Sequence, residues 1–199
     1  MNVLLSLDLS TSCCGWAKFC LDTWQLLGFG IVEPDYKNPK KLLTYPQLHI
    51  VKLRRLADQV IDLIDIYVKK IVIEEINRGK NRLGQKVLDG FHFVLLERMP
   101  WDIARMVVFR DSDGLTGWRS AQGLGLRLSE IDKETNKDRK KLNKKIGRGQ
   151  KKLPLITQKT LACRFANKTY GLDLDCDRDE TDGDKADAIG LGHFYLRKG

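Results

Sequence analysis

The sequence predicts a single α/β domain built on a mixed β-sheet, and three features indicate it. Three short apolar runs near the N-terminus follow one another too closely for helices to fit between them, as in an antiparallel meander. Apolar runs and helical stretches then alternate, and a strand–helix–strand unit implies a parallel pair with a right-handed crossover. The length of 199 residues, 42% of them hydrophobic, suits one domain over residues 1–199.

The order of elements follows from changes in hydrophobic periodicity. In residues 47–67 apolar side chains recur at intervals of three and four, which predicts an amphipathic helix. The run KIVIEEIN, residues 70–77, has the length and apolar content of a buried strand. In chain order we expect strands at 2–10, 15–22 and 24–33, a helix at 47–67, a strand at 70–77, a helix at 87–99 that stops at Pro100, a strand at 104–110, and helices at 155–170 and 185–197.

The charge of the chain is concentrated in one segment. Lys and Arg total 35 against 26 Asp and Glu, a formal charge of +9. Residues 133–152 hold ten bases and two acids, so they carry +8 of it. We interpret this segment as a solvated basic insert at about 130–153, outside the core. Such a one-signed charge indicates an anionic partner such as nucleic acid.

Cysteine usage and hydropathy exclude several other classes of protein. The cysteine count is odd, no C-x-x-C occurs and no secretory signal is present, which indicates reduced thiols and a cytoplasmic protein. The three histidines do not stand at zinc-ligand spacing from the cysteines. No apolar run approaches the ~18 to 20 residues of a membrane helix, so no membrane partner is expected.

Two predicted strands end in carboxylates. Asp8 follows the apolar core of the first strand, and Glu74 and Glu75 follow that of the fourth. If these strands are parallel neighbours, their acids meet at the carboxyl edge of the sheet, where ligands bind in open α/β sheets. Adjacent carboxylates repel unless a cation lies between them, and Mg²⁺ prefers oxygen ligands. Because Glu74 and Glu75 point to opposite faces, alternation leaves open which one takes part.

A third acidic segment opens the last predicted helix. Asp184 and Asp187 are three residues apart and share a helix face, and small residues around them would let this helix lie close to a sheet. A helix cap is the simpler explanation for Asp184 alone. Asp187 lies deeper, where capping explains it poorly. Asp182 is an alternative to Asp184.

Three motifs in order, LLSLDLSTSCCGWA, IVIEEIN and DGDKADAIGLG, resemble the RuvC-type Holliday junction resolvases of the RNase H-like superfamily. The small size and the Trp118-Arg119-Ser120 stretch look most like phage-encoded members. The resemblance implies an RNase H-like fold, with three antiparallel strands followed by parallel strands and flanking helices. The family's four carboxylates, on the first strand, on the fourth strand and in a D-x-x-D pair, correspond to the catalytic and metal-binding set Asp8, Glu74, Asp184 and Asp187.

The resemblance also implies a function. Family members are Mg²⁺-dependent, structure-selective endodeoxyribonucleases that resolve four-way DNA junctions as homodimers. Two ions per active site are expected, with Mn²⁺ as a substitute, and no nucleotide cofactor. Asp8 would bridge both ions, Glu74 would serve one, and Asp184 with Asp187 the other. For a phage-encoded member the compartment would be the host cytoplasm.

Binding to branched DNA needs further residues. Trp118 and Arg119 are expected to hold unpaired bases at the crossover, although core burial of Trp118 is an equal alternative. The apolar face of 87–99 is the expected dimer surface, with core packing as its alternative. The cations expected to contact phosphates are Arg78, Lys80 and Arg82 after the fourth strand and Lys140, Lys141, Lys144 and Lys145 in the insert.

Other functions compete with this interpretation. A nuclease of the same fold acting on other branched DNA or on RNA–DNA hybrids would keep the same chemistry, because fold does not fix the substrate. A non-catalytic nucleic-acid-binding protein is a third hypothesis, which four intact carboxylates disfavour. A P-loop is excluded, since Gly84 precedes Gln-Lys instead of Lys-Ser/Thr.

Overall fold

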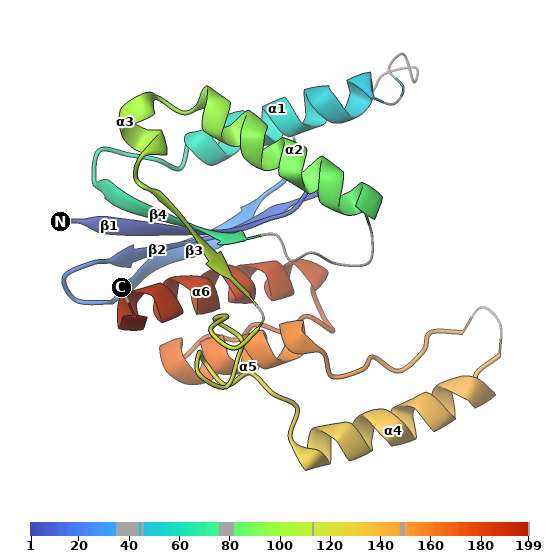
Figure 1. Cartoon of the computed structure of the whole chain (residues 1–199). Helices are drawn as coiled ribbons and strands as arrows, with labels where there is room; N and C mark the ends of the chain where they lie inside the picture. The colour runs from blue at the N-terminus through green and yellow to red at the C-terminus, as the bar shows by residue number, and fades with distance from the viewer. Residues whose placement is uncertain (35–43, 45, 76–81, 113, 148–149, 199) are drawn as a thin grey trace.

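The computed structural model describes residues 1–34, 44, 46–75, 82–112, 114–147 and 150–198, of which 82–86 are described by their backbone alone. One five-stranded sheet has the order β3-β2-β1-β4-β5 (Figure 1). Its strands are β1 (Val3–Leu9), β2 (Cys14–Cys20), β3 (Leu26–Val32), β4 (Val68–Glu75) and β5 (Val107–Asp111).

Strand directions confirm the predicted mixed sheet. β1 pairs antiparallel with β2, and β2 with β3, so the first three strands form the expected meander. β4 lies parallel to β1 and β5 parallel to β4, as the strand–helix–strand unit requires. This order and these directions are those of the RNase H-like fold implied by the resemblance.

Helices cover both faces of the sheet (Figure 1). On one face lie α1 (Gln47–Ile61), α2 (Arg82–Arg98) and the short α3 (Trp101–Ala104). On the other face α6 (Glu180–Lys198) packs on the sheet with α5 (Gln158–Tyr170) beside it, and α4 (Glu130–Lys145) stands apart.

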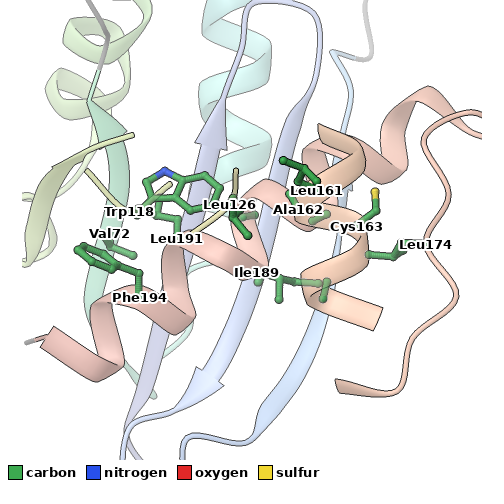
Figure 2. Packing of buried hydrophobic residues seen from close by; sticks show 14 of the residues in the cluster. Val72, Trp118, Leu126, Leu161, Ala162, Cys163, Leu174, Ile189, Leu191 and Phe194 are labelled. Atoms are coloured by element: carbon green, nitrogen blue, oxygen red, sulfur yellow. The ribbon is translucent and has the colours of Figure 1, made fainter. Parts of the chain in front are cut away.

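The alternation of β1 divides the core in two. Leu5 and Leu7 point to the face covered by α1 and α2, whereas Leu4 points to the face covered by α5 and α6. All three are fully buried. Figure 2 shows the second cluster, where Trp118 lies among Val72, Leu191 and Phe194. The central strand therefore contributes to both cores, as expected of a buried parallel strand.

Several element boundaries differ from the prediction: α2 begins at Arg82 instead of residue 87, and α5 begins at Gln158 instead of residue 155. The helix predicted over 47–67 ends at Ile61, and exposed Ile66 and Tyr67 lie in the turn to β4. The strand expected at 104–110 begins only at Val107, because α3 precedes it. The last helix begins at Glu180 instead of residue 185, so the aspartates predicted near its start lie inside it.

The basic insert contains a regular helix. Ser129 caps α4 through a reciprocal capping box with Asp132, and acidic residues in the first turn and lysines in the last suit the helix dipole. Local charge and capping thus favour helix formation despite the shortage of apolar residues. In the described part of the chain no helix is long and apolar enough to cross a membrane, and all five cysteines are free.

Glycines allow α6 to lie against the sheet. A Cβ atom at Gly192 would be 2.3 Å from the Phe19 ring, and one at Gly190 would be 2.6 Å from the Trp118 ring. A Cβ atom at Gly15, on β2, would be 2.1 Å from the Asp184 carbonyl oxygen. This close backbone approach at Gly15 fixes the acidic end of α6 against the sheet.

We predict that Gly15→Ala lowers the free energy of unfolding by about 1–3 kcal/mol or more, because backbone atoms on both sides must move apart. Urea denaturation measures the change. Gly90→Ala is the matched control, since a Cβ there meets nothing within 4 Å, and the helix should gain about 0.5–1 kcal/mol. Equal stability of the parent and Gly15→Ala proteins would contradict the close approach.

Candidate active site

Asp8 and Glu74 lie side by side at the carboxyl edge of the sheet. In the parallel β1–β4 ladder, Leu7 pairs with Ile73, so the next residues on the two strands are Asp8 and Glu74. The Glu74 side chain is 15% exposed and is held by an arginine, whereas Glu75 is exposed. Of the two glutamates, the structure thus places Glu74 beside Asp8 in a half-buried position and leaves Glu75 exposed.

Helix α6 brings two more carboxylates to the same place. Asp184 and Asp187 stand one turn apart on its buried face, with residue exposures of 9% and 2%. Asp184 is the fifth residue of the helix, too deep for the cap that the simpler explanation required. The alternative Asp182 has a structural function, because its carboxylate accepts the Asp175 N–H at 2.9 Å and pairs with Lys185.

Burial and mutual repulsion raise the pKa values of two acids of this group, Asp8 and Asp187. The pKa of Asp8 is raised well above its usual range, first by burial and then by the charges of Asp187, Glu74 and Asp184. Burial also raises the pKa of Asp187 to about 6, although the Arg119 charge opposes this rise. The four acids predicted from distant segments therefore interact at one end of the sheet, where additional positive charge would stabilise their ionised forms.

Arg119 supplies part of that charge. Its guanidinium group bridges two elements, with Nη1 3.2 Å from Glu74 Oε1 and Nη2 2.8 Å from Asp187 Oδ2. The Trp118 ring lies 4.3 Å from the guanidinium carbon in a cation–π contact. The Arg119 side chain is only 15% exposed. The residue predicted as a DNA contact is thus an internal counter-ion of the carboxylates in this structure.

Asp184 has a separate set of partners. Lys159, in the first turn of α5, forms an ion pair with Asp184 Oδ1. The Cys13 thiol donates to Asp184 Oδ2 at 3.0 Å. Burial and the Asp184 carboxylate raise the Cys13 pKa to about 11, so the thiol keeps its proton. Sequence reasoning missed both partners. Lys159 belongs to no motif, and Cys13 lies in the first motif without a predicted function; only the tertiary fold brings them to Asp184.

The expected stacking of Trp118 on DNA bases is wrong for this conformation. Its side chain has no exposed surface and packs against Gly190 on α6. The large indole fills the space that glycine leaves between helix and sheet, so the core alternative holds. The Trp118 ring instead packs against the guanidinium group of Arg119.

The remaining predicted residues have different positions. Arg78 and Lys80 lie outside the described residues, and Arg82 begins α2 with its side chain undescribed. On α2 the apolar residues Phe91 and Leu95 are buried in the core, as the alternative to a dimer surface requires, while Phe93 is 74% exposed. The insert lysines at 140, 141, 144 and 145 are exposed on α4.

The donor set fits a hard divalent ion, although the present arrangement is not a closed metal site. Within the described residues no three His, Cys, Asp or Glu side chains converge closely enough to hold an ion. Arg119 lies between two of the acids. Asp187 Oδ1 is buried and has no hydrogen-bond partner among the described residues, and all four candidate ligands are carboxylates. An ion could enter if the guanidinium withdrew from Glu74 and Asp187.

Comparisons with known proteins give structural likeness alone. No protein-family model matches the chain, and no curated protein matches its sequence. The structure resembles T. thermophilus RuvC in complex with a Holliday junction substrate, at 12% identity over 100% of this chain and 97% of that chain, with a TM-score of 0.48. It also resembles a second Thermus thermophilus RuvC structure, at 14% identity over 99% of this chain and 96% of that chain, with a TM-score of 0.46.

A third likeness is to an archaeal translation termination factor, at 9% identity over 72% of this chain and 39% of that chain, with a TM-score of 0.33. These identities and TM-scores assign neither a family nor a function. The class that the sheet topology and the site define is an RNase H-like domain with a carboxylate cluster at the carboxyl edge of β1 and β4.

We predict that Arg119→Gln raises the affinity for Mn²⁺ by about tenfold or more, because the carboxylates lose the cation that competes with the metal. Without metal the variant should be about 3–5 kcal/mol less stable, the usual cost of breaking a buried ion pair. Isothermal titration calorimetry and thermal unfolding in EDTA measure the two effects.

The matched control is Arg98→Gln, which removes a half-exposed ion pair with Asp58. It should cost at most about 1 kcal/mol and leave Mn²⁺ binding unchanged. Mn²⁺ binding by Arg119→Gln that is no tighter than by the parent protein would show that Arg119 does not compete with metal.

Proposed function

We propose that this protein is a Mg²⁺-dependent endodeoxyribonuclease that cuts four-way DNA junctions. The observation that carries the proposal is that Asp8, Glu74, Asp184 and Asp187 lie near enough at the carboxyl edge of an RNase H-like sheet for the other three charges to raise the pKa of Asp8. The junction as substrate is supported by the three sequence motifs that resemble RuvC-type resolvases and by the basic charge of the chain.

The carboxylates would hold two divalent ions. Bound ions of this kind activate a water molecule and neutralise charge on the scissile phosphate and the leaving oxygen. Asp8 interacts electrostatically with Glu74 on β4 and with Asp184 and Asp187 on α6, so it is the residue suited to ligate both ions. Glu74 would ligate one ion, and Asp184 with Asp187 the other. Mn²⁺, which also accepts oxygen ligands, would substitute for Mg²⁺.

Arg119 and Lys159 would change partners when DNA binds. In the structure each is paired with a carboxylate of the site. Once metal neutralises those carboxylates, both cations stand at the edge of the site, where phosphate oxygens accept charge-assisted hydrogen bonds. The buried Trp118 ring, which contacts the Arg119 guanidinium group in this structure, would remain in the core. The same side chains would thus stabilise the metal-free site and then hold substrate.

A homodimer follows from the symmetry of the substrate, because a two-fold protein presents two identical sites to a two-fold junction. We propose the exposed part of α2 and α3 as the dimer surface. Phe93 and Trp101 are 74% and 82% exposed there, and they line a groove together with Leu96 and Met99. Large exposed aromatic side chains on neighbouring helices are typical of protein interfaces.

Cleavage of labelled DNA tests the function and the alternatives together. The substrates are a four-way junction, a linear duplex and an RNA–DNA hybrid, each with Mg²⁺ or with EDTA. Paired symmetric nicks in the junction alone support the proposal. Cleavage of the hybrid would favour a nuclease of the same fold with another substrate, and binding without cleavage would favour a non-catalytic protein.

We predict that Asp8→Asn lowers junction cleavage by at least about 10³-fold, since the bridging ligand is lost, whereas junction binding in EDTA survives. Asp58→Asn is the matched control, because this half-exposed carboxylate pairs with Arg98 away from the site, and it should cut at the parent rate. Turnover by Asp8→Asn close to that of the parent protein would remove Asp8 from the mechanism.

A further inference from the structure

Helix α4 and the segment that returns from it form one braced arm. Asn136 donates to the Ile156 carbonyl at 2.8 Å and accepts the Ile156 N–H at 2.8 Å. Asn143 forms the same two hydrogen bonds with Leu153, at 2.9 and 2.7 Å. Each asparagine side chain thus bonds both the N–H and the C=O group of one residue, as the backbone of a neighbouring β-strand would. Arg139 adds a hydrogen bond to the Pro154 carbonyl between them.

The spacing of these contacts matches the geometry of the two segments. Asn136 and Asn143 are seven residues apart, which is about 10.5 Å along a helix. Leu153 and Ile156 are three residues apart, which is about 10 Å in extended chain. The returning segment therefore lies in register along α4, and the arm is a braced rod instead of a loose basic loop.

The base of the arm is fixed to the domain. Asp132 of α4, which is buried, forms a 2.7 Å ion pair with Arg164 on α5. Asn136 is also buried where it binds Ile156. Since α5 carries Lys159 at the active site, the direction of the arm is set relative to the carboxylates. Figure 1 shows α4 apart from α5 and α6, so its outer face is not covered by them.

That outer face is a stripe of lysines. Lys133, Lys137, Lys140 and Lys144 recur at intervals of four, three and four, so they share one side of α4 over about 16 Å. Together with Lys141 and Leu128 they line a single groove. Within the described part of the chain no ion pair or hydrogen bond engages the side chains of Lys137, Lys140 or Lys144. Lys133 and Lys141 form only exposed pairs with acids of the same helix, which hold them weakly.

We propose that this stripe binds the phosphate backbone of one double-stranded DNA arm outside the active site. About 16 Å of duplex presents roughly five phosphates per strand, which matches a straight row of lysines one helical turn apart. A lipid surface would require an apolar helix face, and α4 has only Ile131 and Leu142 as apolar residues. Lys133 and Lys137 are thereby added to the lysines expected to contact phosphates. Lys145 points about 100° away from Lys144 around the helix axis and lies off the stripe. The proposal takes its DNA substrate from the proposed function.

The test is DNA binding measured by fluorescence anisotropy in EDTA, so that it does not depend on cleavage. The probes are a labelled four-way junction and a labelled 30-base-pair duplex, over a range of KCl concentrations. The variant is Lys137→Gln/Lys140→Gln/Lys144→Gln, and the matched control Lys69→Gln/Lys70→Gln/Lys168→Gln removes three exposed charges elsewhere. We expect the stripe variant to bind both probes at least tenfold more weakly at 100 mM KCl, with a salt slope smaller by about 2–3. The control should stay within about threefold of the parent protein.

A second variant tests the brace without changing charge. Asn143→Ala removes both hydrogen bonds to Leu153 and should weaken binding severalfold, because the outer lysines lose their fixed position. Equal weakening by the two triple variants, or none by the stripe variant, would overturn the proposal. Binding by Asn143→Ala as tight as by the parent protein would overturn the braced rod. If the parent protein binds DNA through the stripe but does not cut it in Mg²⁺, the proposed nuclease activity alone is refuted. If the parent protein cuts the junction and the stripe variant keeps the parent's salt slope, the stripe proposal alone is refuted.

Discussion

The bridge that Arg119 forms between Glu74 and Asp187 is the interaction on which the rest of the site depends. Bringing several carboxylates to one buried edge is unfavourable, because burial and like charge both oppose their ionisation. Asp8 and Asp187 show this in their raised pKa values. The guanidinium group offsets part of the repulsion and joins β4 to α6. Arg119 thus supplies, from within the chain, a cation for carboxylates that would otherwise repel one another.

The packing of α6 also depends on bringing the carboxylates together. The helix must approach the sheet closely enough for its acids to reach Asp8 and Glu74, and glycines at positions 15, 190 and 192 provide the room. The Trp118 ring fills the space beside Gly190 and at the same time supports Arg119. Core packing and site geometry are therefore one arrangement, in which a change that pushes the helix away also separates the carboxylates.

The sequence predicted the fold because the fold depends on local patterns. Strand-length apolar runs and one strongly periodic helix predicted the meander and the strand–helix–strand unit, and the family resemblance implied how they combine in one sheet. Asp8 stands where an apolar strand ends. Asp187 could be predicted from its spacing to Asp184. The partners of these acids could not, since Lys159 and Cys13 reach Asp184 only through tertiary packing. Alternation could not separate Glu74 from Glu75, which differ only in which face of β4 they occupy.

Composition showed that the insert is basic but not that it is ordered. Its structure comes from two asparagines bonded to backbone on the returning segment, a contact that no charge count contains. Trp118 was undecided for a similar reason, because an aromatic residue in a loop can be core or surface until the opposing glycine on α6 is known. In both cases a pairing between distant segments determined the outcome.

Diffraction from crystals soaked in Mn²⁺ tests the central claim most directly, since anomalous scattering locates the metal without reference to activity. The account predicts anomalous peaks among the carboxylates of Asp8, Glu74, Asp184 and Asp187, with the Arg119 guanidinium withdrawn from Glu74 and Asp187. Saturating Mn²⁺ that leaves this cluster without an anomalous peak, and Arg119 still bridging the two acids, would contradict it.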